Sequence, residues 1–112
     1  MLTEKDYCDY DTCVALKELG YPTKMTFVNE FGSIEIPVNS GLIQLYEAQK
    51  WLRKEKRILI LPDYNSFGWF CGIHYPINSV KMFKYTAKEV NSYEEALLEG
   101  IKEAIKLLKE EM

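Results

Sequence analysis

The sequence predicts an α+β domain of two layers, with helices packed on one face of a mostly antiparallel sheet. Apolar residues recur at helical spacing in three segments. Short β-branched and aromatic runs lie between these segments, and the turns that join the runs are short enough for hairpins. The expected order of elements is α-β-β-α-β-β-(β)-α. With 112 residues the chain has the length of one domain, residues 1–112.

The first helix is predicted over about 9–19. It should end at Leu19-Gly20-Tyr21-Pro22, because glycine adopts the left-handed conformation that closes a helix and a following proline blocks its continuation. A β-hairpin should follow, with strands at 25–28 and 34–38. Pro37 has no N–H for a ladder hydrogen bond, so we expect its strand to lie at a sheet edge or to end there.

The second helix is predicted over about 42–56, after Asn39-Ser40-Gly41. Leu45, Ala48 and Leu52 share one side of it. Next come a buried strand at 58–61, a loop at 62–68 and a strand at 69–75, with a third strand at 80–86 left open. The last helix should begin at Ser92, which forms a capping box with Glu95. Its apolar stripe is Leu97, Ile101, Ala104, Ile105 and Leu108.

Composition points to a cytoplasmic protein. The longest aliphatic run, Ile58–Leu61, is far shorter than the roughly 20 residues of a membrane helix. The start of the sequence is polar and acidic and lacks the features of a signal peptide. Three cysteines are an odd number and are sparsely placed, so we expect no disulfide framework.

Charge is uneven along the chain. Residues 1–49 hold three basic and eight acidic groups, residues 50–57 hold five and one, and residues 58–112 hold six and eight. The net charges are −5, +4 and −2, which total −3. One basic stripe thus lies within an acidic protein, which argues against a general polyanion binder.

Three segments carry a family resemblance: Leu16-Lys17-Glu18-Leu19-Gly20-Tyr21, the stretch from Leu45 to Arg53 (LYEAQKWLR), and Asn91-Ser92-Tyr93-Glu94-Glu95-Ala96-Leu97. With them the chain resembles a family of small uncharacterised proteins encoded in phages and mobile elements of Bacteroidetes. The resemblance covers most of the chain from about Leu16 onward. It implies a bacterial or prophage origin and no activity or catalytic residue.

Cys8, Cys13, Cys71 and His74 are the candidate metal ligands. Cys71 and His74 are three apart in a predicted strand and should point to opposite faces, and residues five apart in a helix do not converge. We therefore interpret the thiols as two buried groups and one partly exposed group. The same geometry argues against a Cys71–His74 dyad, and no phosphate loop, dinucleotide fingerprint or nucleophile elbow is present. We predict no catalytic residue, no metal and no cofactor, and hence no enzyme.

Two binding hypotheses remain. The basic stripe with nearby aromatics could bind nucleic acid, and the helix–strands–helix order of the C-terminal half is similar to a double-stranded-RNA-binding domain. The stripe is also explained as a solvated face that complements the helix dipole. The residues of this candidate site are Lys50, Arg53, Lys54, Arg57, Tyr64, Phe67 and Trp69.

Fifteen aromatic residues, which are eight Tyr, five Phe and two Trp, exceed what a small two-layer core readily hides. Phe27, Trp51 and Phe70 are expected in the core. Tyr and Trp anchor protein interfaces, so the leading hypothesis is a non-enzymatic protein-interaction module whose partner is another protein or a second copy, as in a homodimer. Nucleic acid is the alternative partner; no membrane and no small-molecule substrate are expected. Some of the remaining aromatics should stay exposed at the surface, and the candidates are Tyr7, Tyr10, Tyr21, Phe31, Tyr64, Phe67, Trp69 and Tyr93.

Overall fold

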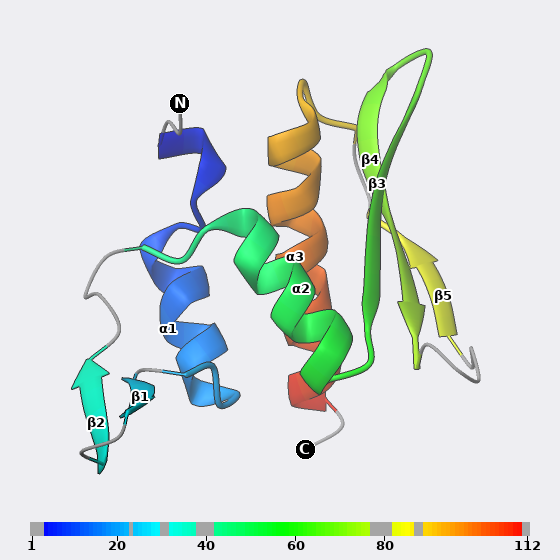
Figure 1. Cartoon of the computed structure of the whole chain (residues 1–112). Helices are drawn as coiled ribbons and strands as arrows, with labels where there is room; N and C mark the ends of the chain where they lie inside the picture. The colour runs from blue at the N-terminus through cyan, green and yellow to red at the C-terminus, as the bar shows by residue number, and fades with distance from the viewer. Residues whose placement is uncertain are drawn as a thin grey trace.

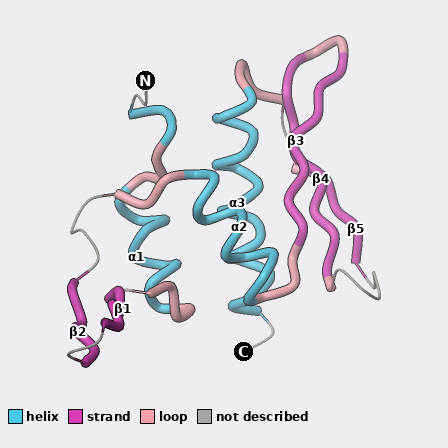
Figure 2. The backbone as a smooth tube through the Cα atoms, in the orientation of Figure 1, coloured by secondary structure: helices cyan, strands magenta, loops and turns pink. Residues whose placement is uncertain are grey.

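The computed structural model describes residues 4–22, 24–29, 32–37, 42–76, 82–86 and 89–110. These residues form three α-helices, one short 3-10 helix and two antiparallel sheets (Figures 1 and 2). The predicted α+β class, the three helices and the antiparallel pairing of strands are confirmed, but the described strands form two separate sheets, of two and three strands, where one sheet is predicted. The elements are η1 (Glu4–Asp6), α1 (Tyr10–Glu18), β1 (Lys24–Asn29), β2 (Gly32–Pro37), α2 (Leu45–Glu55), β3 (Leu59–Asn65), β4 (Gly68–Tyr75), β5 (Met82–Tyr85) and α3 (Tyr93–Glu110).

Helix α1 lies within its predicted span. Asp9 caps it, because its carboxylate accepts a hydrogen bond of 2.9 Å from the Thr12 backbone N–H. At the other end Gly20 has a φ of 107°. The Tyr21 and Gly20 backbone N–H groups donate to the Leu16 and Lys17 carbonyls. These bonds satisfy carbonyls that the last turn of a helix leaves unpaired, as the glycine predicts.

The predicted first hairpin is present as β1 and β2, which form a separate two-stranded sheet. Its register runs from Lys24 opposite Pro37 to Asn29 opposite Gly32. Since a two-stranded sheet consists of edges only, the position of Pro37 agrees with its missing N–H. Figure 1 places this hairpin near α1, on the far side of the helices from β3, β4 and β5. Val38, Phe31 and residues 39–41 lie outside the described residues.

Helix α2 begins three residues later than predicted, and tertiary hydrogen bonds explain the difference. Ile43 accepts a bond of 2.7 Å from the Cys8 N–H, and its own N–H donates to the Cys13 sulfur at 3.3 Å. Tyr7 and Gln44 also form an isolated antiparallel bridge. These contacts hold the chain extended up to Gln44, so Leu42 and Ile43 precede the helix.

Residues 62–68 are predicted as a loop, but most of them belong to strands. Strand β3 continues through Pro62 to Asn65, and the turn between β3 and β4 contains only residues 66 and 67. Asn65 initiates the turn, because its side-chain oxygen accepts from the Phe67 N–H at 2.7 Å. Pro62 is tolerated because β3 is an edge strand of the β3-β4-β5 sheet.

The sequence leaves open whether 80–86 forms a strand, and the described part of this segment does form one. Residues Met82–Tyr85 form β5, which pairs antiparallel with β4 from Tyr75 opposite Met82 to Gly72 opposite Tyr85. Residues 80 and 81 lie outside the described residues. The expected capping box of α3 is confirmed by a 3.1 Å bond from the Glu95 N–H to the Ser92 hydroxyl oxygen.

The core lies between α3 and the β3–β4 pair. Gly100 allows α3 to lie close against β3 and β4. A Cβ placed there would lie 2.5 Å from the Cys71 sulfur and 2.7 Å from a methyl carbon of Ile60. All three cysteines are buried, so the expectation of one partly exposed thiol is wrong. Among the described residues no helix has both the length and the apolar character needed to cross a membrane. The fully buried large side chains are Leu16, Leu45, Leu52, Ile58, Ile60, Ile73, Leu97 and Ile101.

Strand register corrects one predicted core residue. Phe70 pairs with Asp63, one position away from Cys71, and therefore lies on the sheet face that α3 does not contact. It is half-buried there and packs edge to face on Tyr85 with ring centroids 5.3 Å apart. Trp51 is also only half-buried, beside the core. The side chain of Phe27 is not described.

Candidate interaction surface

Four aromatic rings form a continuous row at one end of the molecule. We call Tyr46, Tyr93, Trp69 and Tyr64 the aromatic row. Ring centroids are 6.4 Å apart between Tyr46 and Tyr93, 5.7 Å between Tyr93 and Trp69, and 5.2 Å between Trp69 and Tyr64. Spacings of this size are those of favourable ring contacts, so the row is one connected surface built from α2, α3, β4 and β3.

Helix direction explains why these residues meet. Tyr46 is the second residue of α2 and Tyr93 is the first of α3, so their contact requires the two helices to begin side by side. Trp69 and Tyr64 are directly opposite each other in the β3–β4 register. The hairpin extends past the start of α3 (Figure 1), which brings the Trp69 ring onto Tyr93.

Backbone and side-chain hydrogen bonds hold the hairpin against the segment before α3. Trp69 and Val90 exchange two backbone bonds of 2.8 and 2.7 Å, and Asn65 donates to Glu89 at 3.1 Å. Gly68 allows the start of β4 to lie close to Val90, because a Cβ there would lie 2.7 Å from the Val90 backbone oxygen. The row is therefore held in place by regular secondary structure, and its geometry is preorganised within the single chain.

The row is open to solvent at both of its ends. Tyr46 is 44% exposed and Tyr64 is 68% exposed, while Trp69 and Tyr93 are half-buried. Phe67, at the tip of the β3–β4 turn, is 83% exposed. Phe67 thus adds an exposed apolar ring to the same hairpin that carries the exposed Tyr64.

Carboxylates border the aromatic row. Partial burial raises the pKa of the Tyr46 hydroxyl, and the carboxylate of Glu94, the neighbouring Tyr93 and Asp6 raise it further. A shallow hollow next to this border is lined by four carboxylates and one ammonium group together with apolar side chains. Its charged residues are Glu4, Asp9, Glu94, Glu95 and Lys5, and its apolar ones include Leu42 and Leu98. The surface around the row is thus acidic and partly apolar, which favours a cationic partner and repels phosphate.

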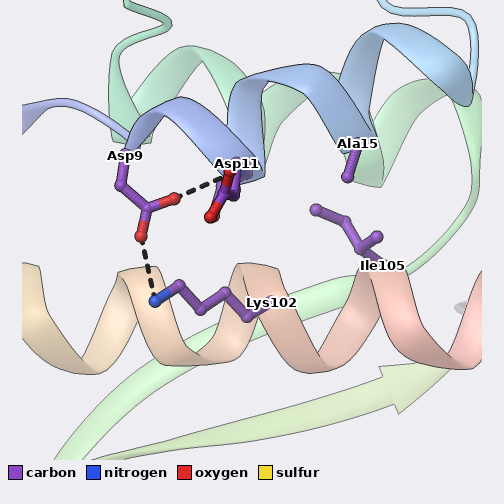
Figure 3. A pocket seen from close by; sticks show the side chains of 6 residues that line it. Asp9, Asp11, Ala15, Lys102 and Ile105 are labelled. Carbon is purple, nitrogen blue, oxygen red and sulfur yellow. Dashed lines mark hydrogen bonds and ion pairs between the residues drawn. The ribbon is translucent and has the colours of Figure 1, made fainter.

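Acidic residues gather at one end of the helices and basic residues at the other, because all three helices run in the same direction (Figure 1). Figure 3 shows Asp9, at the start of α1, binding Lys102 near the middle of α3 at 3.0 Å. Glu18, at the end of α1, binds Lys109 near the end of α3 at 3.1 Å. The first turns of the helices carry acidic residues and the last turns carry basic ones, which complements the aligned helix dipoles.

The structure divides the sequence-predicted site into two parts. Lys50, Arg53 and Lys54 are exposed along the second half of α2, and Arg57 is exposed just beyond it. Tyr64, Phe67 and Trp69 lie at the far end of the hairpin. Tyr64 follows Arg57 by seven residues, most of them in β3, which at about 3.3 Å per residue is roughly 20 Å. The basic and aromatic residues therefore do not form one site.

The sequence does not identify Tyr46 as a member of the surface, although it is 44% exposed. It also indicates no role for Tyr85, which is 56% exposed on the outer face of the sheet, away from the aromatic row. Of the candidate surface aromatics, Tyr10, Tyr64 and Phe67 are exposed, whereas Tyr7, Tyr21, Trp69 and Tyr93 are half-buried. Phe31 lies outside the described residues. The contact of Tyr46 with Tyr93 depends on helix direction, which no local pattern shows.

The thiols have no catalytic or metal-binding arrangement in the described part of the chain. Burial raises the pKa of Cys8 and of Cys71 to about 12 in each case. Cys13 donates to the Cys8 carbonyl at 3.7 Å while accepting from Ile43. The register places His74 opposite Leu59 and Cys71 opposite Pro62, so the two side chains lie on opposite faces. No cluster of three or more His, Cys, Asp or Glu suited to a metal occurs in the described ranges.

Comparison with known proteins gives no further guide to function. No family model, no curated protein and no solved structure matches the chain.

Proposed function

We propose that the protein is a non-enzymatic interaction module that associates with copies of itself through the aromatic row and the adjoining Phe67. The observation that carries this proposal is the continuity of the row. Four rings touch in sequence, and both end rings are substantially exposed. Tyr and Trp offer large contact areas with few rotatable bonds, so they lose little entropy when an interface orders them.

The fold supports this use of the row. In the proposed two-layer arrangement α2 and α3 cover one face of the β3-β4-β5 sheet, and the hairpin projects beyond the first turn of α3. The Gly100 contact with Cys71 and Ile60 supports the packing of these layers. The cytoplasmic location and the phage-related origin predicted from the sequence are part of the same proposal, and the three reduced, buried thiols are compatible with that location.

Nucleic-acid binding receives less support than protein binding. Aromatic stacking on bases works together with nearby cations that neutralise phosphates. The acidic residues near the row or the hairpin that carries it include Asp6, Glu94, Glu89 and Asp63. Of the basic stripe, Lys50 lies one helical turn from Tyr46, whereas Arg53, Lys54 and Arg57 lie toward the other end of α2. The basic residues are also accounted for by the negative C-terminal ends of the helices.

Light scattering coupled to size exclusion tests the proposal. The wild-type protein should elute at more than the 13.1 kDa of one chain, with an apparent mass that rises with concentration. Replacing Tyr64→Ser together with Phe67→Ser should return it to the mass of a monomer. Tyr85→Ser is the matched control, because Tyr85 is 56% exposed but lies on the outer sheet face, and it should associate like the wild type.

Two results would contradict the proposal. A wild-type protein that stays monomeric up to millimolar concentration does not self-associate. A loss of association with Tyr85→Ser, but not with the hairpin variant, would assign the interface to the outer sheet face instead. Salt-sensitive retardation of RNA or DNA that Arg53→Glu with Arg57→Glu abolishes would establish the nucleic-acid alternative.

A further inference from the structure

We infer that the aromatic row of one copy receives the basic second half of α2 from another copy, so that the chains associate head to tail. This inference rests on the proposed self-association and specifies which surface is the partner. We call the aromatic row with its acidic border the head. The tail consists of Arg53 and Lys54 in the last turn of α2 and the following Arg57. Lys50 is not part of it, because it lies one helical turn from Tyr46 of the head.

The first argument is charge complementarity within one chain. Residues 50–57 carry a net charge of +4, whereas the remaining segments are negative. The described carboxylates near the head include those of Asp6 and Glu94 beside Tyr46 and that of Asp63 beside Tyr64. Two heads would bring carboxylates together, and two tails would bring cations together. Only a head against a tail pairs opposite charges, so a contact between identical surfaces is disfavoured.

The second argument is the chemistry of the two surfaces. Cationic side chains bind over the faces of Tyr and Trp rings, and an arginine can also pair with a carboxylate in the same contact. The chain already makes one such contact internally, because the Lys56 ammonium lies 5.5 Å from the centre of the Trp51 ring. Arg53, Lys54 and Arg57 are all exposed and lie within five residues of one another, so they present several cations to one partner.

The third argument is geometric. The helices run in parallel from the head end of the molecule to the tail end (Figure 1), with α2 alone spanning 11 residues, or about 16 Å. A contact between surfaces at opposite ends of a protein leaves one head and one tail free in every dimer. Such heterologous contacts add further copies unless a ring closes. Association should therefore proceed beyond a dimer as concentration rises.

A complementation experiment tests this arrangement. One variant removes the head by Tyr46→Ser with Tyr64→Ser, and the other removes the tail by Arg53→Glu with Arg57→Glu. Each variant alone should be monomeric in sedimentation velocity, with a dissociation constant for self-association at least tenfold above that of the wild type. Mixed one to one, they should form a dimer that does not grow, because each variant supplies the surface that the other lacks.

Control measurements show whether a loss of association comes from unfolding or from the change in net charge, and not from the loss of the interface. Both variants should retain the circular dichroism spectrum and thermal transition of a folded protein. Lys17→Glu reverses an exposed charge in the last turn of α1 and should associate like the wild type. Wild-type association should weaken at least tenfold between 50 and 500 mM salt, as expected for contacts between exposed charges.

The outcomes separate this inference from the proposed function. If the wild type associates but the mixed variants remain monomeric, the contact joins identical surfaces, and the head-to-tail inference is wrong while self-association stands. If either variant alone assembles like the wild type, the surface removed in it plays no part and the inference fails. If the mixture grows beyond a dimer, an additional surface is in use and the inference also fails. If the wild type is monomeric, self-association itself is wrong.

Discussion

Trp69 and Tyr93 meet edge to face, with ring centroids 5.7 Å apart and ring planes at 76°. The contact joins strand β4 to the first residue of α3. Each end is fixed independently, Trp69 by its paired backbone bonds with Val90 and Tyr93 by the Ser92 cap that begins the helix. The aromatic row is therefore held by the same interactions that position the hairpin on the helix.

Removal of the central ring should weaken both the fold and the association. We expect Trp69→Ala to lower the free energy of unfolding by about 2–4 kcal/mol, since it removes a half-buried ring and two ring contacts. Trp69→Phe keeps an aromatic ring at that position and should recover most of the stability. Urea unfolding measures the first effect and sedimentation velocity the second. A Trp69→Ala protein with wild-type self-association would show that the row does not form the interface.

The close contact between α3 and β4 should make Gly100 intolerant of a larger side chain. Gly100→Ala adds a carbon 2.5 Å from the Cys71 sulfur, so we expect a loss of about 1–3 kcal/mol, although alanine by itself favours a helix by about 1 kcal/mol. Cys71→Ala in the same chain should recover part of the loss. A double-mutant cycle by chemical denaturation measures this coupling. Strict additivity of the two substitutions would contradict the packing described for the core.

Asp9 should make stability depend on pH in the acid range. Its hydrogen bond with Thr12, and then the ammonium group of Lys102, lower the pKa of this carboxyl from 3.8 to about 2. Because the folded pKa lies below the unfolded one, the stabilisation is fully present above about pH 4 and is lost as the pH falls towards 2. Asp9→Asn retains a capping oxygen but not the charge, so its stability should decline less than that of the wild type across this range.

Denaturant midpoints at a series of pH values measure that difference. Asp11→Asn is the matched control, because Asp11 lies in the same turn of α1 and lines the same shallow groove as Asp9 and Lys102. It should follow the wild-type curve. Parallel curves for the wild type and for Asp9→Asn between pH 4 and pH 2 would show that the Asp9 contacts contribute no charge-dependent stability.

The three thiols should be unreactive in the folded protein. Cys8, Cys13 and Cys71 are at most 4% exposed, and burial raises the pKa of both Cys8 and Cys71 to about 12. A thiolate is the reactive form, so a thiol reagent at pH 8 should modify all three only at the rate at which the protein unfolds. One equivalent of rapid modification without denaturant would contradict the burial of these residues.

Local signals in the sequence predicted the elements they control directly. Gly20 ends α1 and Ser92 begins α3 through hydrogen bonds to residues at most four positions away. The start of α2 could not be predicted in this way, because Ile43 is held by Cys8 and Cys13, 30 or more residues earlier. Pro62 indicated a loop locally, yet an edge position in the sheet accommodates it within β3.

The candidate site shows the same division between local and tertiary information. The number of aromatic residues predicts that some of them are exposed, and Tyr64 and Phe67 are two that the structure leaves exposed. The separation of these residues from Arg53 and Arg57 follows from the length and direction of β3, and the contact of Tyr46 with Tyr93 follows from parallel helices. Both features arise from the tertiary arrangement of elements, on which helical and strand periodicity carries no information.

Backbone amide chemical shifts recorded over a range of protein concentrations test the central claim most directly. They report which residues enter the interface without altering the chain. Self-association through the head and tail predicts concentration-dependent shifts in two groups, one at residues 64–69 and 93 and one at residues 53–57. Concentration-dependent shifts confined to Leu61, Phe70 and Tyr85 on the outer sheet face, or no shifts at any residue, would contradict the account.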